Sequence, residues 1–405
     1  MKKEVRRSPE QILLPEGFSF AAVAAGIKAS GRPDLALAEA CEGATAAAVF
    51  TKNRVAAAPV EVGRAVMKTS RGRIRAVLVN SGNANCATGP EGRAACDLVC
   101  KGAARLLGFR NEEVFPSSTG IIGVPLPSGK MLAKLPELLA ARSASEESAR
   151  AFANAILTTD TRLKIASARV KIGRRQVTLL GVAKGSGMIH PKMATMLAYI
   201  FTDVAASARE LQQLLRKASD ETFNCISVDG DTSTNDTVLL LASGKSGVNL
   251  SPASRAKFAK ALHGVCASLA EQIVSDGEGA KHIIHLSIEQ ARDREEALQV
   301  ARAISHSPLV KTAWAGSDPN WGRILAAIGN SGVPVDPARV KIFIAGQMVC
   351  RNGAFHKFDE QRAHEHLSQP DCEIRVQLQR GRTKLLFLTT DLTAEYVHIN
   401  ADYST

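Results

Sequence analysis

The chain has 405 residues, 45% of them hydrophobic and 22% charged, which is typical of a folded globular protein, and no run of about 18 uncharged apolar residues could form a membrane-spanning helix. Its net charge of +12 is uneven, because residues 1–194 carry 29 Lys and Arg against 15 Asp and Glu, whereas residues 195–405 carry 22 against 24. Only 4% of the residues are aromatic and the basic residues are scattered, so this composition does not favour nucleic acid as a partner.

The N-terminal sequence does not match a secretory signal. Four of the first seven residues are Lys or Arg, but Glu4, Glu10, Pro15 and Glu16 interrupt this basic and apolar pattern. The eight cysteines form no C-x-x-C pair, which indicates reduced thiols rather than a disulfide framework or a zinc site. We therefore expect a cytoplasmic protein that neither binds a metal nor associates with a membrane.

The first half of the chain alternates apolar strands with turn-rich segments. The β-branched run 74–79 predicts a buried strand that ends in a polar loop at 80–85, and the apolar spacing that follows predicts a helix over 90–107. Residues 116–123 form a second turn-rich segment. Residues 176–183 predict a strand that runs into the glycine-rich loop beginning at Lys184.

The second half predicts helices, strands and two hairpins. These elements are a strand that starts at Thr195 and continues to 201, helices at 206–223, 251–275 and 295–304, strands at 237–242 and 282–288, and hairpins that pair 340–345 with 348–351 and 373–379 with 384–390. This mixture predicts a layered α/β (α+β) fold with mixed and antiparallel sheets packed against helices. No flexible linker occurs around residue 194, so a cut there would fall inside a folded unit.

Two motifs that resemble ligand sites lack key residues. Gly185-Ser-Gly187 has no third glycine of a dinucleotide fingerprint, and no phosphate-binding P-loop occurs, so we expect no nucleotide cofactor. The segment from Asp229 resembles the start of a calcium loop, but Thr234 and Leu240 stand where a Gly and a bidentate Glu are required. A hydrogen-bonded structural loop is the favoured interpretation.

Thr195 follows Ala194 in a glycine-rich, apolar stretch near the middle of the chain. A threonine hydroxyl is a weak nucleophile that needs a base, and a cut just before it would supply one as its new α-amine. From these residues alone, a nucleophile and an ordinary structural threonine both remain open.

The whole chain resembles the glutamate N-acetyltransferase/ornithine acetyltransferase family of arginine biosynthesis, from residue 26 to the last residue. Many short motifs carry the resemblance, in order along the chain: Gly26–Lys28, Ala48–Asn53, Ala57–Val60, Asn80–Asn85, Ser118–Gly120, Thr158–Thr161, Lys184–Ile189, Met193–Leu197, Val228–Thr237, Asp276–Gly279, Leu309–Ala313, Asp318–Arg323 and Ile399–Thr405. So many ordered matches make chance agreement negligible.

The resemblance implies a self-cleaving enzyme. The precursor would cut itself between Ala194 and Thr195 into an α chain, 1–194, and a β chain, 195–405, which stay associated as a heterotetramer of two α and two β chains. Thr195 would then carry an acetyl group from N-acetylornithine to glutamate without a bound cofactor, with its α-amine, of reference pKa about 7.7–8.0, as the base. The motifs leave open whether acetyl-CoA is also an acetyl donor.

The resemblance also assigns roles to individual residues. It implies that Thr119 and Gly120 stabilise the oxyanion, and that the substrate is bound by Thr158, Lys184, Thr195, Glu278, Asn400 and Thr405. Lys184 suits a substrate carboxylate and Glu278 a substrate ammonium group. The sequence departs from the usual motif at Lys192, where relatives often have Asn or Asp, which adds a positive charge three residues before Thr195.

Two other classes of function stay open at this point. A self-processing hydrolase or aminopeptidase of the same design would use water as the acceptor and release free acetate from the same donor. A non-catalytic binding protein would remain one uncut chain.

Overall fold

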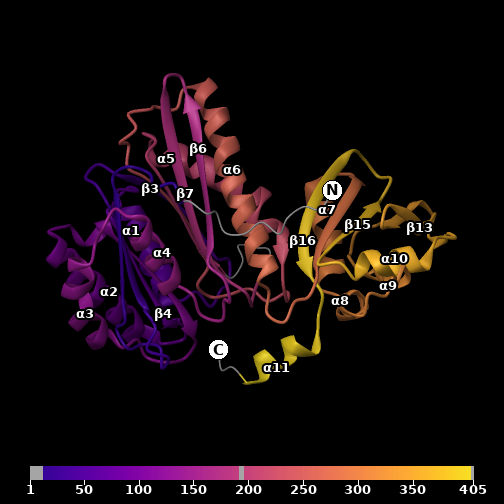
Figure 1. The fold of residues 1–405 in the computed structure, drawn as a ribbon, viewed down its shortest axis with the longest axis horizontal. Helices are drawn as coiled ribbons and strands as arrows, with labels where there is room; N and C mark the ends of the chain where they lie inside the picture. Colours follow the sequence, from indigo (N-terminus) through magenta and orange to yellow (C-terminus); the bar gives the residue numbers. More distant parts are fainter. Residues whose placement is uncertain (1–11, 191–195, 403–405) are drawn as a thin grey trace.

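A four-stranded mixed sheet and four helices form the first part of the computed structural model, which describes residues 12–190 and 196–402. The strands lie in the order β1 (Phe18–Val23), β2 (Leu35–Ala40), β4 (Ala76–Asn83) and β5 (Val114–Ile121). The helices that pack with them are α1 (Ala58–Thr69), α2 (Gly89–Leu107), α3 (Ser128–Ala140) and α4 (Glu146–Ala155), and a 3₁₀ turn, η1, spans Asn111–Glu113. This part lies on the left of Figure 1.

A five-stranded sheet occupies the middle of the molecule (Figure 1). Its order is β3 (Thr45–Phe50), β10 (Thr237–Ala242), β8 (Leu197–Thr202), β7 (Arg175–Lys184) and β6 (Lys164–Ile172), and α5 (Ala208–Glu221) and α6 (Pro252–Ser275) pack against it. Strand β8 is buried along its whole length because its side chains alternate between two cores: Tyr199 and Phe201 enter the core shared with β1 and α4, and Ile200 enters the core shared with α5 and α6.

A seven-stranded sheet forms the third part, on the right of Figure 1. Its order is β14 (Ala354–Phe355), β13 (Gln347–Arg351), β12 (Lys341–Ile344), β15 (Asp371–Gln377), β11 (Ile283–Ala291), β16 (Thr383–Thr390) and β9 (Ile226–Ser227). The remaining elements are α7 (Arg294–Ser305), α8 (Pro308–Ala315), α9 (Trp321–Gly329), α10 (Glu360–Leu367), α11 (Ala394–Asp402), η2 (Phe223–Cys225) and η3 (Pro337–Arg339).

The predicted fold class is confirmed, and most predicted elements are present. All three sheets combine parallel and antiparallel pairs and pack against helices. The helices predicted at 90–107, 206–223, 251–275 and 295–304 correspond to α2, α5, α6 and α7. The strand predicted at 237–242 is β10, and 340–345 with 348–351 forms the predicted hairpin of β12 and β13.

The second predicted hairpin is wrong. Both of its strands exist, as β15 and β16, but β11 lies between them and pairs parallel with β15 and antiparallel with β16. The β11 residues Ile284, Leu286 and Ile288 have no exposed surface, so the central place of β11 in the sheet buries its apolar side chains. The connection after β15 crosses the end of β11, where the backbone N–H of Arg380 donates to Gln290.

The two segments predicted as turn-rich loops, 80–85 and 116–123, lie mostly within strands. Strand β4 continues through Asn83 and β5 continues through Ile121, side by side in parallel. Polar side chains at this edge are hydrogen bonded: the Ser118 hydroxyl donates to Asn80 Oδ1 in the neighbouring strand at 2.6 Å, and Asn80 Nδ2 donates to the backbone carbonyl of Asn83 within β4 at 2.9 Å. A strand rich in Asn and Ser is stable here because these buried groups have partners.

Candidate active site

Six of the residues that the family motifs assign to the site line one narrow pocket. They come from five segments of the chain: Thr119 and Gly120 from β5, Thr158 from the loop between α4 and β6, Lys184 from the end of β7, Glu278 from the loop after α6, and Asn400 from α11. The other three assigned residues, Ala194, Thr195 and Thr405, lie outside the described residues.

Gly120 occupies a position that only glycine fits. Its φ of 133° lies in a region that side-chain-bearing residues rarely adopt, and a Cβ there would lie 2.3 Å from the Gly82 carbonyl carbon. Asn235 fixes the same edge, because its Nδ2 donates to the carbonyls of Ala84 at 2.6 Å and Ser118 at 2.9 Å. The ends of β4 and β5 are therefore held close together, with Thr119 and Gly120 facing the pocket.

Lys184 connects the oxyanion candidate to a buried carboxylate. Its side chain is largely buried, and Nζ donates to the Thr119 hydroxyl oxygen at 3.3 Å. The same Nζ lies 3.8 Å from Asp160 Oδ2. A hydroxyl that accepts a hydrogen bond from a lysine keeps its own proton, so the Thr119 hydroxyl can donate a hydrogen bond to a developing oxyanion.

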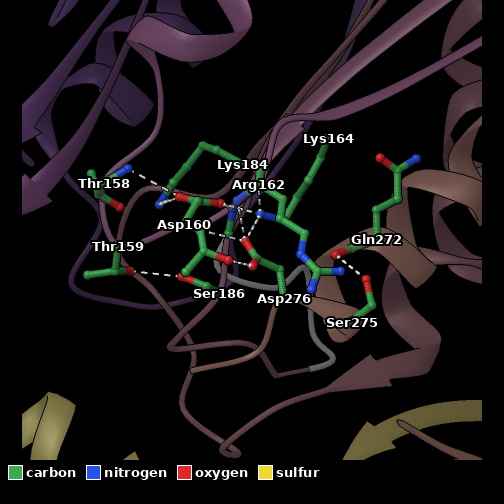
Figure 2. Close-up of polar contacts among 12 residues, drawn as sticks. Thr158, Thr159, Asp160, Arg162, Lys164, Lys184, Ser186, Gln272, Ser275 and Asp276 are labelled. Atoms are coloured by element: carbon green, nitrogen blue, oxygen red, sulfur yellow. Dashed lines mark hydrogen bonds and ion pairs between the residues drawn. The ribbon is translucent and has the colours of Figure 1, made fainter. Parts of the chain in front are cut away.

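Asp160, Lys164 and Asp276 form a buried ion-pair network behind Lys184 (Figure 2). Lys164 Nζ lies 2.7 Å from Asp160 Oδ1 and 2.6 Å from Asp276 Oδ2. Burial alone would raise the pKa of Asp160, but the ammonium groups of Lys184 and Lys164 lower it to about 2. Asp160 is therefore ionised at neutral pH.

The loop after α6 places Glu278 at the pocket. Its backbone N–H donates to the Ser186 carbonyl at 3.0 Å, and a Cβ on Gly187 would lie 2.3 Å from its Oε2. Asn400 Nδ2 donates to the same Oε2 at 3.0 Å, which brings α11 to the pocket mouth. The hydroxyl groups of Thr159 and Ser186 lie 2.8 Å apart and connect the loop between α4 and β6 to the loop that follows β7 (Figure 2).

Two aspartates hold the residues on either side of segment 191–195. Asp229 accepts hydrogen bonds from the backbone N–H groups of Met188 at 2.5 Å and Ile189 at 2.9 Å, as the structural-loop interpretation of its motif expects. Asp236 Oδ1 accepts from the N–H of Met196 at 3.0 Å. Burial raises the pKa of Asp229 to about 6 and that of Asp236 well above its usual value.

Sequence reasoning missed the buried residues that support the site. Asp160 and Asp276 belong to motifs that carried the family resemblance, but nothing in the sequence pairs both with Lys164, 112 residues from Asp276. Asn235 and Asp236 likewise lie in a motif, Val228–Thr237, that carried the resemblance, but the sequence assigned neither residue a role at the site. Among residues 12–190 and 196–402, no group of three or more His, Cys, Asp or Glu side chains could hold a metal ion. No helix in the same ranges is long and apolar enough to span a membrane.

Comparisons with known proteins identify relatives along almost the whole chain. The ArgJ family model matches residues 19–405. The arginine biosynthesis bifunctional protein ArgJ of Methylococcus capsulatus is 46% identical over 394 residues, which cover 96% of this chain and 95% of the relative. The protein of the same name from Thermus thermophilus is 45% identical over 394 residues, covering 97% of this chain and 100% of the relative.

Solved structures carry related names. A crystal structure of the arginine biosynthesis bifunctional protein ArgJ from Bacillus halodurans is 41% identical and covers 51% of this chain and 98% of its own, with a TM-score of 0.49. A structure of ornithine acetyltransferase from Mycobacterium tuberculosis, in complex with ornithine, is 37% identical and covers 44% of this chain and 93% of its own, with a TM-score of 0.39.

Proposed function

Because this chain belongs to the ArgJ family, we propose that it is an acetyltransferase of arginine biosynthesis that moves an acetyl group from N-acetylornithine to glutamate. The family membership agrees with the resemblance that the sequence motifs carry. One observation supports the assignment of the site: six residues that the motifs name separately, from five segments, line the same pocket.

In the proposed reaction, Thr195 carries the acetyl group. Its hydroxyl oxygen attacks the acetyl carbonyl of N-acetylornithine while its α-amine takes the hydroxyl proton, and the same proton leaves on the amine of ornithine. The α-amine of glutamate then attacks the acetyl-Thr195 ester and returns the threonine hydroxyl. Thr119 and Gly120 donate hydrogen bonds to the oxyanion in both steps.

The charges around the pocket suit an amino-acid substrate. Lys184 supplies a cation for a carboxylate, and Glu278, which lines the same pocket, supplies an anion for an ammonium group. Thr158 and Asn400 add uncharged hydrogen-bonding groups to the same pocket, and we assign Thr405 to substrate binding with them.

We propose that the chain cuts itself between Ala194 and Thr195. The hydroxyl of Thr195 would attack the Ala194 carbonyl, and an ester would replace the peptide bond between the two residues. Hydrolysis of this ester gives chains 1–194 and 195–405. The flanking strands support the association of the products, because β7 pairs with β8 and Lys184 lies opposite Leu197. Two copies of each chain would form the assembly.

No bound cofactor is needed for this transfer, because the acetyl group arrives on the substrate. The relatives are named bifunctional. We therefore propose acetyl-CoA as a second donor that acetylates glutamate at the same Thr195, and we place the enzyme in the cytoplasm.

The test combines mass spectrometry of the denatured protein with an acetyl-transfer assay, for the wild type and Thr195→Ala. We expect the wild type to yield both chains and to form N-acetylglutamate, and the variant to remain intact and inactive. An uncut wild type, or a Thr195→Ala protein that is still cut at 194/195 and fully active, contradicts the proposal. Release of free acetate in place of N-acetylglutamate would identify a hydrolase.

A further inference from the structure

Lys164 is the buried centre of the network in Figure 2. It begins β6, its side chain is 1% exposed, and its ammonium group lies between the carboxylates of Asp160 and Asp276. It does not line the pocket. A buried lysine between two buried carboxylates is costly to desolvate, so its position calls for an explanation beyond packing.

The hydrogen bonds of Asp160 show what this lysine does for its neighbour. Asp160 Oδ1 accepts from Lys164 at 2.7 Å and from the Gly185 N–H at 2.6 Å, and Oδ2 accepts from the Thr158 N–H at 3.2 Å. With these partners in place, Lys184 stays 3.8 Å from Oδ2 and donates to Thr119 instead.

Asp276 is also fully engaged. It accepts from Lys164, from the Thr161 hydroxyl, and from the backbone N–H groups of Thr161 at 3.0 Å and Arg162 at 3.3 Å. The two aspartates and Lys164 therefore carry one net negative charge, which Lys184 balances without a direct hydrogen bond.

We propose that Lys164 is a positioning residue for substrate binding: it engages Asp160 and Asp276 so that the Lys184 ammonium stays at the pocket, available to a substrate carboxylate. This inference rests on the proposed function, because it takes Lys184 as the group that binds that carboxylate. Without Lys164, Lys184 is the ion-pair partner that Asp160 keeps among the described residues, and Lys184 moves from Thr119 to Asp160.

The test is a set of variants that either create or remove this competition. Lys164→Met should raise KM for N-acetylornithine and for glutamate at least tenfold and leave kcat within about threefold. In Lys164→Met with Asp160→Asn, the competing carboxylate is absent, so KM should return to within about threefold of the wild type. A purely structural role predicts the opposite, because the second substitution would add to the damage.

Lys311→Met is the matched control. Lys311 is also a buried lysine, 3% exposed, but it donates to Thr390 at the end of β16 in the seven-stranded sheet. We expect the KM values of Lys311→Met to stay within twofold of those of the wild type. An unchanged KM in Lys164→Met, or a double variant that binds more weakly than the single one, overturns the proposal.

Two further measurements keep the test decisive. If Lys164→Met does not fold, Asp160→Asn alone answers the question, since a freed Lys184 predicts an unchanged or lower KM, and a fivefold rise contradicts it. Calorimetric binding of ornithine, measured without turnover, separates the two proposals. A wild type that transfers no acetyl group refutes the proposed function. The role of Lys164 is still decided by ornithine affinity, which should fall tenfold in Lys164→Met and recover when Asp160→Asn is added.

Discussion

Replacing Thr119 with alanine removes a hydroxyl that does two things in the proposed mechanism. It accepts the hydrogen bond from Lys184 at 3.3 Å, and it donates to the oxyanion. Loss of one such donor costs about 2.7–4 kcal/mol, which corresponds to a fall in kcat of about 100-fold to 1,000-fold. Because the oxyanion exists only in the transition state and the intermediates, KM should change much less than kcat.

The assay is steady-state formation of N-acetylglutamate by Thr119→Ala, with Thr119→Ser as the control. Serine keeps the hydroxyl and loses only a methyl group, so we expect it to stay within about tenfold of the wild type. Both proteins should yield chains 1–194 and 195–405 in equal amounts before their rates are compared. A Thr119→Ala enzyme with a kcat within tenfold of the wild type, or one as active as Thr119→Ser, would refute the oxyanion assignment.

Two more predictions concern neighbouring groups. In Gly187→Ala, the new Cβ would lie 2.3 Å from Glu278 Oε2 and displace that carboxylate. The KM for N-acetylornithine should therefore rise by about tenfold, which corresponds to about 1.4 kcal/mol of binding free energy. An unchanged KM would show that Glu278 does not bind substrate. In the folded protein, burial raises the pKa of Asp236 above its unfolded value, so this group costs stability as pH rises from about 4 through the raised pKa. The melting temperature of Asp236→Asn minus that of the wild type should therefore increase as the pH rises from 5 to 8. A difference in melting temperature that stays constant across that range contradicts the raised pKa of Asp236.

Local elements of the fold could be predicted from the sequence, but the order of strands in the sheets could not. The apolar spacing of α6 and the apolar run of β10 depend on residues close in the sequence, and both elements were predicted correctly. The place of β11 between β15 and β16 depends on contacts across about 90 residues, which periodicity does not record. The strand ends at Asn83 and Ile121 were missed because their polar residues hydrogen bond across strands rather than in turns.

The candidate site was likewise predicted only in part. The family motifs name Thr119, Lys184 and Glu278 one at a time, and the structure brings these residues to one pocket, while their roles stay predictions. The Lys164 network was not predicted, because its meaning comes from two carboxylates that approach one ammonium group only after folding.

The order of the five-stranded sheet bears on how the enzyme can be made. Strands β10 and β8 follow the proposed cut, and they lie between β3 and β7, which precede it. A second chain synthesised by itself would leave both outer edges of a fully buried, apolar strand pair open to other copies, a recognised cause of aggregation. Translation as one polypeptide, with the cut made after folding, lets the first chain cover these edges before they can meet another molecule.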